Sequence, residues 1–224
     1  MFIWKRGKVK GSFNKLISHL DLTFSDHGIF RLFWRSWGVL PGKMYRSNQP
    51  YPFQLKKDIQ KYNIRSILNL RGKRNCSSFY LEKDFCLNND LFLYNFPLSS
   101  RDLPSKETVL SFFDLLNEIE YPCLMHCKSG ADRAGLASVL YMIYKENHNV
   151  SDALKQLSFK HLHLKYAKTG ILDFFFNHAI EIKKNKSTMF IDWIKKDYEK
   201  SELKKKFKYN NLFSFLVDKI LRRE

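Results

Sequence analysis

The stretch Leu124–Gly135, LMHCKSGADRAG, holds the residues of this sequence that are best suited to chemistry. An apolar run precedes it and a helical pattern follows, which predicts a loop between a strand ending at His126 and a helix beginning near Ala131. Gly130 lets such a loop fold tightly. Its backbone N–H groups and the positive end of the helix would then converge on one point, an arrangement that favours a tetrahedral dianion such as phosphate.

Two side chains of this stretch are suited to phosphoryl transfer. Cys127 stands at the entrance of the loop, where N–H donors, the helix end and a guanidinium lower a thiol pKa below its free value of about 8.5. The resulting thiolate is a nucleophile at neutral pH. Arg133 can return over the loop and hold two phosphate oxygens with its planar fork, more strongly as charge spreads over the oxygens in the transition state.

The spacing Cys-x5-Arg, with His126 before the cysteine and Gly130 in the centre, resembles the signature of the cysteine-dependent protein tyrosine and dual-specificity phosphatases. The string HCKSGADRAG is most similar to the TpbA-like bacterial branch, and MYRSNQP followed by IRSILNLRG resembles the opening of the same domain. The similarity runs from Lys43 to Asp173. It implies attack by Cys127 on phosphorus, a cysteinyl-phosphate intermediate and hydrolysis by water without a metal or other cofactor.

The same resemblance implies a general acid on a loop upstream of the cysteine. The segment FPLSSRDLP places Asp102 on such a loop, between a predicted strand and a predicted helix, so Asp102 is the predicted proton donor to the leaving group. Asp132 is its rival, and we expect it to hydrogen-bond the backbone or the substrate instead. His126 is expected to orient the cysteine. The predicted phosphate-binding loop comprises Lys128, Ser129, Gly130, Ala131, Asp132 and Arg133.

Position 134 departs from the family pattern. Most relatives carry Ser or Thr directly after the arginine, where the hydroxyl stabilises the departing thiolate as the phosphoenzyme hydrolyses, and this sequence has Ala134. A lost hydrogen bond to a charged group costs about 1.5–3 kcal/mol, which is roughly tenfold or more in rate. We therefore predict a slow second step and no effect on the first.

The elements that position these residues follow from the hydrophobic pattern. Strands are predicted in the segments KMYRSNQP, IRSILNL, LFLYNF and CLMH. Helices are predicted in QLKKDIQKY, in the segment after the cap Ser105, in SDALKQL after the cap Ser151, and in TGILDFFFNHAIEI. A further helix, from Ala131 to about Glu146, is predicted to bury one face. Their order predicts an α/β fold with a central, mostly parallel sheet flanked by helices, like that of the dual-specificity phosphatases, with helical extensions at both ends.

Three segments are predicted along the chain. Residues 1–40 read as a basic, aromatic helical lead-in, residues 41–182 as the phosphatase domain, and residues 183–224 as a basic amphipathic helical tail. No apolar run is long enough to span a bilayer, and the N-terminus lacks the pattern of a secretory signal. We expect a cytoplasmic protein, with peripheral contact to the inner face of a membrane through its basic ends as an open alternative.

Charge and cysteine usage limit the partners. The net charge of +17 is concentrated at the two ends of the chain. Residues 1–46 contain nine Lys/Arg and only two acidic residues, Asp21 and Asp26. Such a field favours polyanionic partners, but the sequence has no motif that reads nucleic acid, so no nucleic-acid partner is expected.

Neither the four cysteines nor the pair His161 and His163 has metal-ligand spacing, which predicts free thiols and no metal site.

Three functions remain open at this point. The first is a phosphatase acting on phosphotyrosine in proteins, with phosphoserine or phosphothreonine as further substrates. The second is the same chemistry on an anionic phospholipid or another small polyanionic phosphate, which Lys128 and the net charge favour. The third is a non-catalytic phosphate-binding module, which only Ala134 favours. Arg46 and Arg71 are expected to make structural hydrogen bonds rather than to bind the phosphate.

Overall fold

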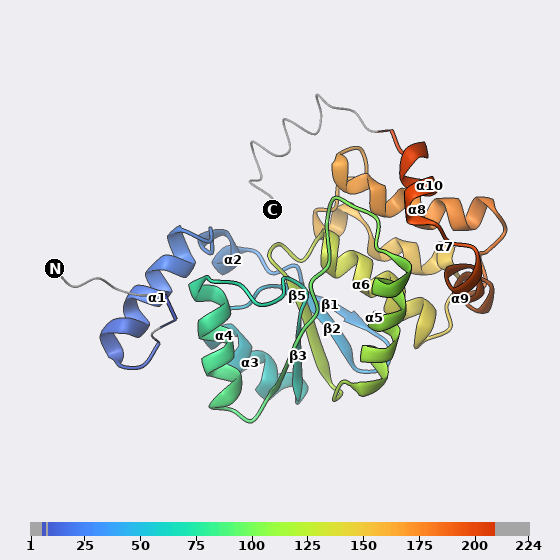
Figure 1. Ribbon diagram of the computed structural model, residues 1–224. Coiled ribbons are helices and arrows are strands. Elements are labelled where there is room, and N and C mark those ends of the chain that lie inside the picture. The colour runs from blue at the N-terminus through green and yellow to red at the C-terminus, as the bar shows by residue number, and fades with distance from the viewer. Residues whose placement is uncertain (1–5, 8, 209–224) are drawn as a thin grey trace. The chain divides into compact units, whose positions relative to one another are not determined.

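The computed structural model describes residues 6–7 and 9–208 (Figure 1). The end of the predicted amphipathic tail, NLFSFLVDKILRRE, lies outside the described residues. The chain divides into two compact units: unit 1 comprises Met1–Val39, Lys43–Pro97 and Glu120–Ser129, and unit 2 comprises Leu40–Gly42, Leu98–Ile119 and Gly130–Glu224. The predicted segment boundaries at residues 40 and 182 stay predictions.

A five-stranded sheet forms the centre of unit 1 and confirms the predicted α/β class. Its strands are β1 (Gly38–Leu40), β2 (Met44–Asn48), β3 (Ser66–Asn69), β4 (Phe92–Asn95) and β5 (Cys123–Cys127), in the order β1-β2-β5-β3-β4. β5 pairs in parallel with β2 on one side and β3 on the other, so that Leu124 lies opposite Tyr45 and Ile67. β3 and β4 are also parallel. β5 is buried throughout, which places Cys127 at the carboxyl end of a central strand.

In its described residues, unit 1 also contains the helices α1 (Ser12–Phe24), α2 (Ile29–Phe33), α3 (Pro52–Tyr62) and α4 (Ser77–Leu87). α3 and α4 cover a face of the sheet, where Leu55 of α3 and Cys86 of α4 are buried together with Ile67 and Leu124 (Figure 1). α1 packs against α4 through a small cluster that consists of Leu22, Tyr51 and Leu81.

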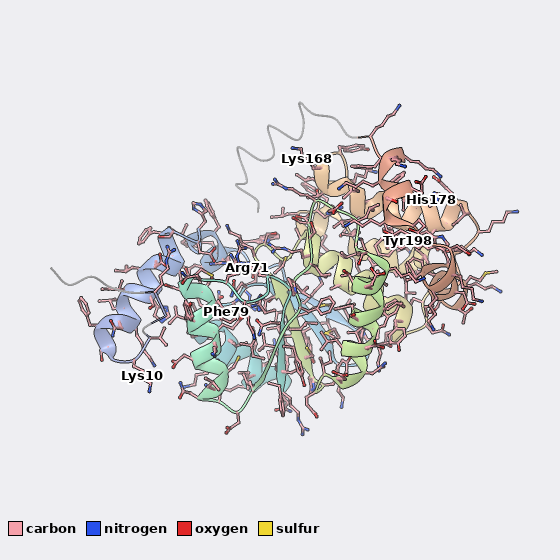
Figure 2. All side chains as sticks on the ribbon, viewed as in Figure 1. Lys10, Arg71, Phe79, Lys168, His178 and Tyr198 are labelled. Atoms are coloured by element: carbon pink, nitrogen blue, oxygen red, sulfur yellow. The ribbon has the colours of Figure 1, made fainter. Side chains whose placement is uncertain are left out.

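Unit 2 is helical. Its helices are α5 (Lys106–Glu118), α6 (Asp132–Tyr144), α7 (Val150–Ala153), α8 (Ile171–Glu181), α9 (Ser187–Lys196) and α10 (Lys200–Lys206). The predicted cap of α5 is confirmed, because the Ser105 side chain accepts a hydrogen bond from the backbone N–H of Thr108. α8 and α9 share an aromatic core with Tyr198 (Figure 2), whose hydroxyl donates to the carbonyl of Pro104.

Three local expectations were wrong, and one helix was missed. Residues 38–40 of the predicted helical lead-in form β1. α4 was not predicted, because its buried residues include Ser77, Ser78 and Glu82, which hide the apolar period. Asn149, not Ser151, precedes α7, which gives way after one turn to a 3-10 helix. α6 does not bury one face: every residue from Asp132 to Ile143 is buried.

Within the described residues, no helix has both the length and the apolar character that crossing a bilayer requires.

Candidate active site

The predicted phosphate-binding loop connects the end of β5 to the start of α6. Cys127 is the last residue of β5 and is 1% exposed, and Asp132 is the first residue of α6. Gly130 has a φ of 76°, in the left-handed region that glycine adopts without strain, as the sequence predicted. On the unit 1 side, the backbone N–H of Gln49 donates to the carbonyl of Lys128, which ties the start of the loop to the chain beyond β2.

His126 has a buried carboxylate partner that the sequence did not predict. Its Nε2 lies 2.8 Å from Oε1 of Glu82 on α4, and both side chains are almost fully buried. Gln49 Nε2 also approaches the same Glu82 oxygen, at 3.4 Å. Glu82 thus lies beside the ring of the residue that precedes Cys127. The stretch SSFYLEKDFCL also contains Lys83 and Asp84, so no local signal marked Glu82 as the buried carboxylate.

Lys128 also has an acidic partner. Its Nζ lies 3.8 Å from Oδ1 of Asp26, which is located between α1 and α2. Arg71 donates to both oxygens of Asp26, at 2.8 and 2.9 Å, and Arg31 donates at 3.0 Å (Figure 2 labels Arg71). Burial alone would raise the pKa of Asp26, but Arg71 and Arg31 outweigh it and hold that pKa well below its usual range. The structural role expected for Arg71 is therefore present, and part of the Lys128 charge is balanced by Asp26.

In unit 2, Asp132 is tied to α8 through His163. His163 Nδ1 lies 2.8 Å from Asp132 Oδ1, and its Nε2 lies 2.5 Å from Asp173 Oδ2. Burial lowers the pKa of His163, but its hydrogen bonds to the two carboxylates raise it to about 9. At neutral pH the ring is thus an imidazolium that donates from both nitrogens. The sequence missed this group because its members are far apart along the chain.

The structure offers no evidence for a metal centre near these residues. Within the part of the chain that is described, no group of His, Cys, Asp or Glu side chains is arranged to hold a metal ion. His163 and its two carboxylates instead form a chain of charged hydrogen bonds.

The two residues after Asp132 are also buried. Arg133 is 8% exposed and Ala134 is fully buried. One turn further along α6, the hydroxyl of Ser138 donates to the carbonyl of Ala134 at 2.6 Å. The helix backbone thus uses the Ser138 hydroxyl.

Asp102 lies on the loop before α5 and is ion-paired with α10. Lys200 Nζ lies 2.7 Å from one oxygen of Asp102, and Lys204 Nζ lies 2.8 Å from the other. Partial burial raises the pKa of Asp102, but hydrogen bonds from the two lysines outweigh it and lower that pKa below its ordinary value. In this arrangement Asp102 is ionised at neutral pH. The sequence predicted the basic tail, but not that its lysines contact the candidate acid.

The four cysteines are free thiols, as predicted. Burial raises the pKa of Cys123 to about 12, and burial also raises the pKa of Cys86. These two thiols are therefore inert at neutral pH. Cys76 Sγ lies 3.2 Å from the hydroxyl of Ser78.

Unit 1 contains Cys127, His126 and Lys128, whereas unit 2 contains Arg133 and Asp102. The meeting of these side chains around one phosphate stays a prediction from the motif.

No protein-family model and no curated protein matches the sequence. Several solved structures do match the structure. P. aeruginosa TpbA shares 18% identity over 64% of this chain and 91% of its own, with a TM-score of 0.47. The core catalytic domain of the PP-IP phosphatase SIW14 from S. cerevisiae shares 18% identity over 69% and 93%, with a TM-score of 0.49. A DUF442 protein from Shewanella putrefaciens shares 17% identity over 64% of this chain and 92% of its own, with a TM-score of 0.48. At these values the likeness assigns no activity to this chain.

Proposed function

We propose that this chain is a cysteine-dependent phosphatase that hydrolyses phosphate monoesters through a cysteinyl-phosphate intermediate. The observation that carries the proposal is the setting of Cys127: it ends a central parallel strand, and Gly130 turns the following loop into the start of a buried helix. The carboxyl ends of parallel strands and the N-termini of the helices that follow them are where α/β folds bind anions.

The proposed reaction has two steps. The Cys127 thiolate attacks phosphorus, the S–P bond forms, and the bond from phosphorus to the leaving oxygen breaks while Asp102 donates a proton to that oxygen. Arg133 holds two of the remaining phosphate oxygens and is most effective when their charge is greatest. Water then attacks phosphorus, the Asp102 carboxylate accepts a proton from it, and the S–P bond breaks to release inorganic phosphate and the thiolate.

Asp102 acts as an acid only when it carries a proton, and its pairing with Lys200 and Lys204 opposes protonation. In our proposal this ion pair is the resting arrangement, and a bound phosphate dianion raises the Asp102 pKa by repulsion. The rival acid, Asp132, is 4% exposed and already accepts a hydrogen bond from His163, which supports Asp102 as the donor.

The decisive experiment is turnover of an aryl phosphate by the full chain. We expect activity that Cys127→Ser and Arg133→Lys each reduce by at least about a thousandfold, because the nucleophile or the bidentate contact is lost. Cys76→Ser is the matched control and should keep the rate. Phosphate binding without any turnover would support the non-catalytic module instead, which only Ala134 favours.

For the substrate we propose phosphotyrosine in proteins, with dual specificity for phosphoserine and phosphothreonine. The net charge of +17 favours a more anionic alternative, an anionic phospholipid or a small polyanionic phosphate. The pairing of Lys128 with Asp26 weakens the part of that argument that rests on the loop. Comparing kcat/KM for phosphotyrosine peptides, phospholipid vesicles and phosphosugars at equal ionic strength distinguishes the two classes.

A further inference from the structure

α1 presents an apolar stripe to solvent. Phe13, Leu16, Leu20 and Phe24 recur at helical spacing on one face, and between 48% and 64% of each residue is exposed. The opposite face of the helix is the one that packs on α4, through Leu22. The helix is thus held in place by one apolar face and leaves a second one uncovered.

α2 and the residue after it extend this exposure. Phe30 is 72% exposed and Phe33 is 86% exposed. We name the whole set the N-terminal apolar surface, and it comprises Phe13, Leu16, Leu20, Phe24, Ile29, Phe30, Leu32, Phe33 and Trp34. Single exposed apolar residues are common on proteins, but so many in two consecutive helices mark a surface that binds something.

The segment that carries this surface is basic in composition, with nine Lys/Arg and two aspartates in residues 1–46. Some of its cations are used within the fold: Arg6 pairs with Asp21, Lys15 with Asp84 and Arg35 with Asp58, while Arg31 and Arg46 are buried. The second aspartate, Asp26, pairs with Arg71. Lys10 is exposed just before α1, and Figure 2 shows it pointing away from the helix. The segment therefore attracts anions and offers no uncompensated carboxylate that would repel them.

We propose that the N-terminal apolar surface binds the surface of an anionic lipid bilayer, with α1 and α2 lying in the headgroup region. Helices that carry Phe, Leu and Trp on one side and Lys or Arg around them are suited to this position. Apolar burial and attraction to anionic headgroups then act together. A bilayer also accommodates an exposed apolar helix face without requiring a complementary shape, which favours it over a folded protein partner.

Vesicle co-sedimentation of the full chain tests this inference, with phosphatidylcholine vesicles compared with vesicles that contain about 30% phosphatidylserine. Cys127→Ser is measured in parallel, because lipid binding stands apart from the proposed hydrolysis. We expect both proteins to bind the anionic vesicles and to be released as salt is raised.

The variant that isolates the surface is the double substitution Phe30→Ser with Phe33→Ser. We expect its partition to anionic vesicles to fall roughly tenfold or more, since two aromatic side chains no longer enter the interface. The matched control is Leu87→Ser with Phe159→Ser, which removes side chains of similar exposure, 70% and 72%, on other elements. Both double variants should turn over a soluble aryl phosphate at the unsubstituted rate.

Three results would overturn the inference. The first is no sedimentation of the unsubstituted chain with either vesicle. The second is an equal loss for the two double variants. The third is a dimer by light scattering that Phe30→Ser with Phe33→Ser converts to a monomer, because the surface would then be an interface between two copies. None of these results would affect the proposed hydrolysis, which is measured on the soluble substrate.

Discussion

His163 donates a hydrogen bond from Nδ1 to Oδ1 of Asp132 across 2.8 Å. Asp132 directly precedes Arg133, the proposed phosphate-binding cation, and the other ring nitrogen of His163 reaches Asp173 on α8. The His163 imidazolium therefore connects the first turn of α6 to α8, which begins more than two dozen residues after α6 ends.

The pH dependence of stability follows from this contact. The folded-state pKa of His163 is raised to about 9 from an ordinary value of 6.5. Its stabilisation is therefore complete below about pH 6.5 and is lost as pH rises through about 9. Compared with His163→Gln, the unsubstituted chain should be more stable by on the order of 2 kcal/mol at pH 6, and this difference should shrink at pH 10. Urea unfolding at each pH measures this difference in the free energy of unfolding, with His148→Gln as the control. A difference that does not change with pH would contradict the raised pKa of His163.

The lysines of α10 should set the pH range of catalysis. Replacing Lys200 and Lys204 with Met removes the cations that lower the pKa of Asp102, so that pKa rises. An acid with a higher pKa stays protonated to higher pH, and the descending limb of kcat/KM against pH should move upward for a substrate with a poor leaving group. Lys205→Met, on the same helix but paired with Glu202, serves as the control. An unmoved limb would count against Asp102 as the acid.

Leaving-group dependence separates the two candidate acids. Asp102→Asn should lower the rate roughly a hundredfold or more for an alkyl phosphate and much less for a p-nitrophenyl phosphate, whose leaving group needs little protonation. Asp132→Asn should slow both substrates alike and lower the stability, because His163 loses a charged partner. If the two variants exchanged these profiles, Asp132 would be the acid.

Ala134 should make the phosphoenzyme accumulate. With no hydroxyl at this position, hydrolysis of the cysteinyl-phosphate becomes the slow step, and rapid quench followed by mass spectrometry should find phosphate on Cys127 during turnover. Ala134→Ser should lower this occupancy and raise kcat by up to about tenfold. Thermal unfolding of the variant must be compared as well, since the site is fully buried. An empty Cys127 under steady turnover of the unsubstituted chain would refute the prediction.

The sequence predicted the features whose causes are local. A short apolar run located β5 and a helical pattern located α5, the Ser105 cap needs only its neighbour three residues on, and the turn at Gly130 follows from glycine itself. The partners of the loop residues could not be predicted in this way. Glu82 reaches His126, and Lys200 reaches Asp102, across long separations in the chain. Such contacts depend on how the elements pack, which no local pattern encodes.

Helix α6 has no solvent-facing positions between Asp132 and Ile143, so it has no sites where substitutions are tolerated at little cost. Inactivity of a variant in this helix is therefore ambiguous by itself, because disruption of packing and loss of a chemical role lead to the same reading in an activity assay. For Arg133 and Ala134, the folded fraction must be known before a rate is interpreted. Tolerance to change, and with it the freedom to alter specificity, has to lie in partly exposed side chains outside this helix, such as Lys128.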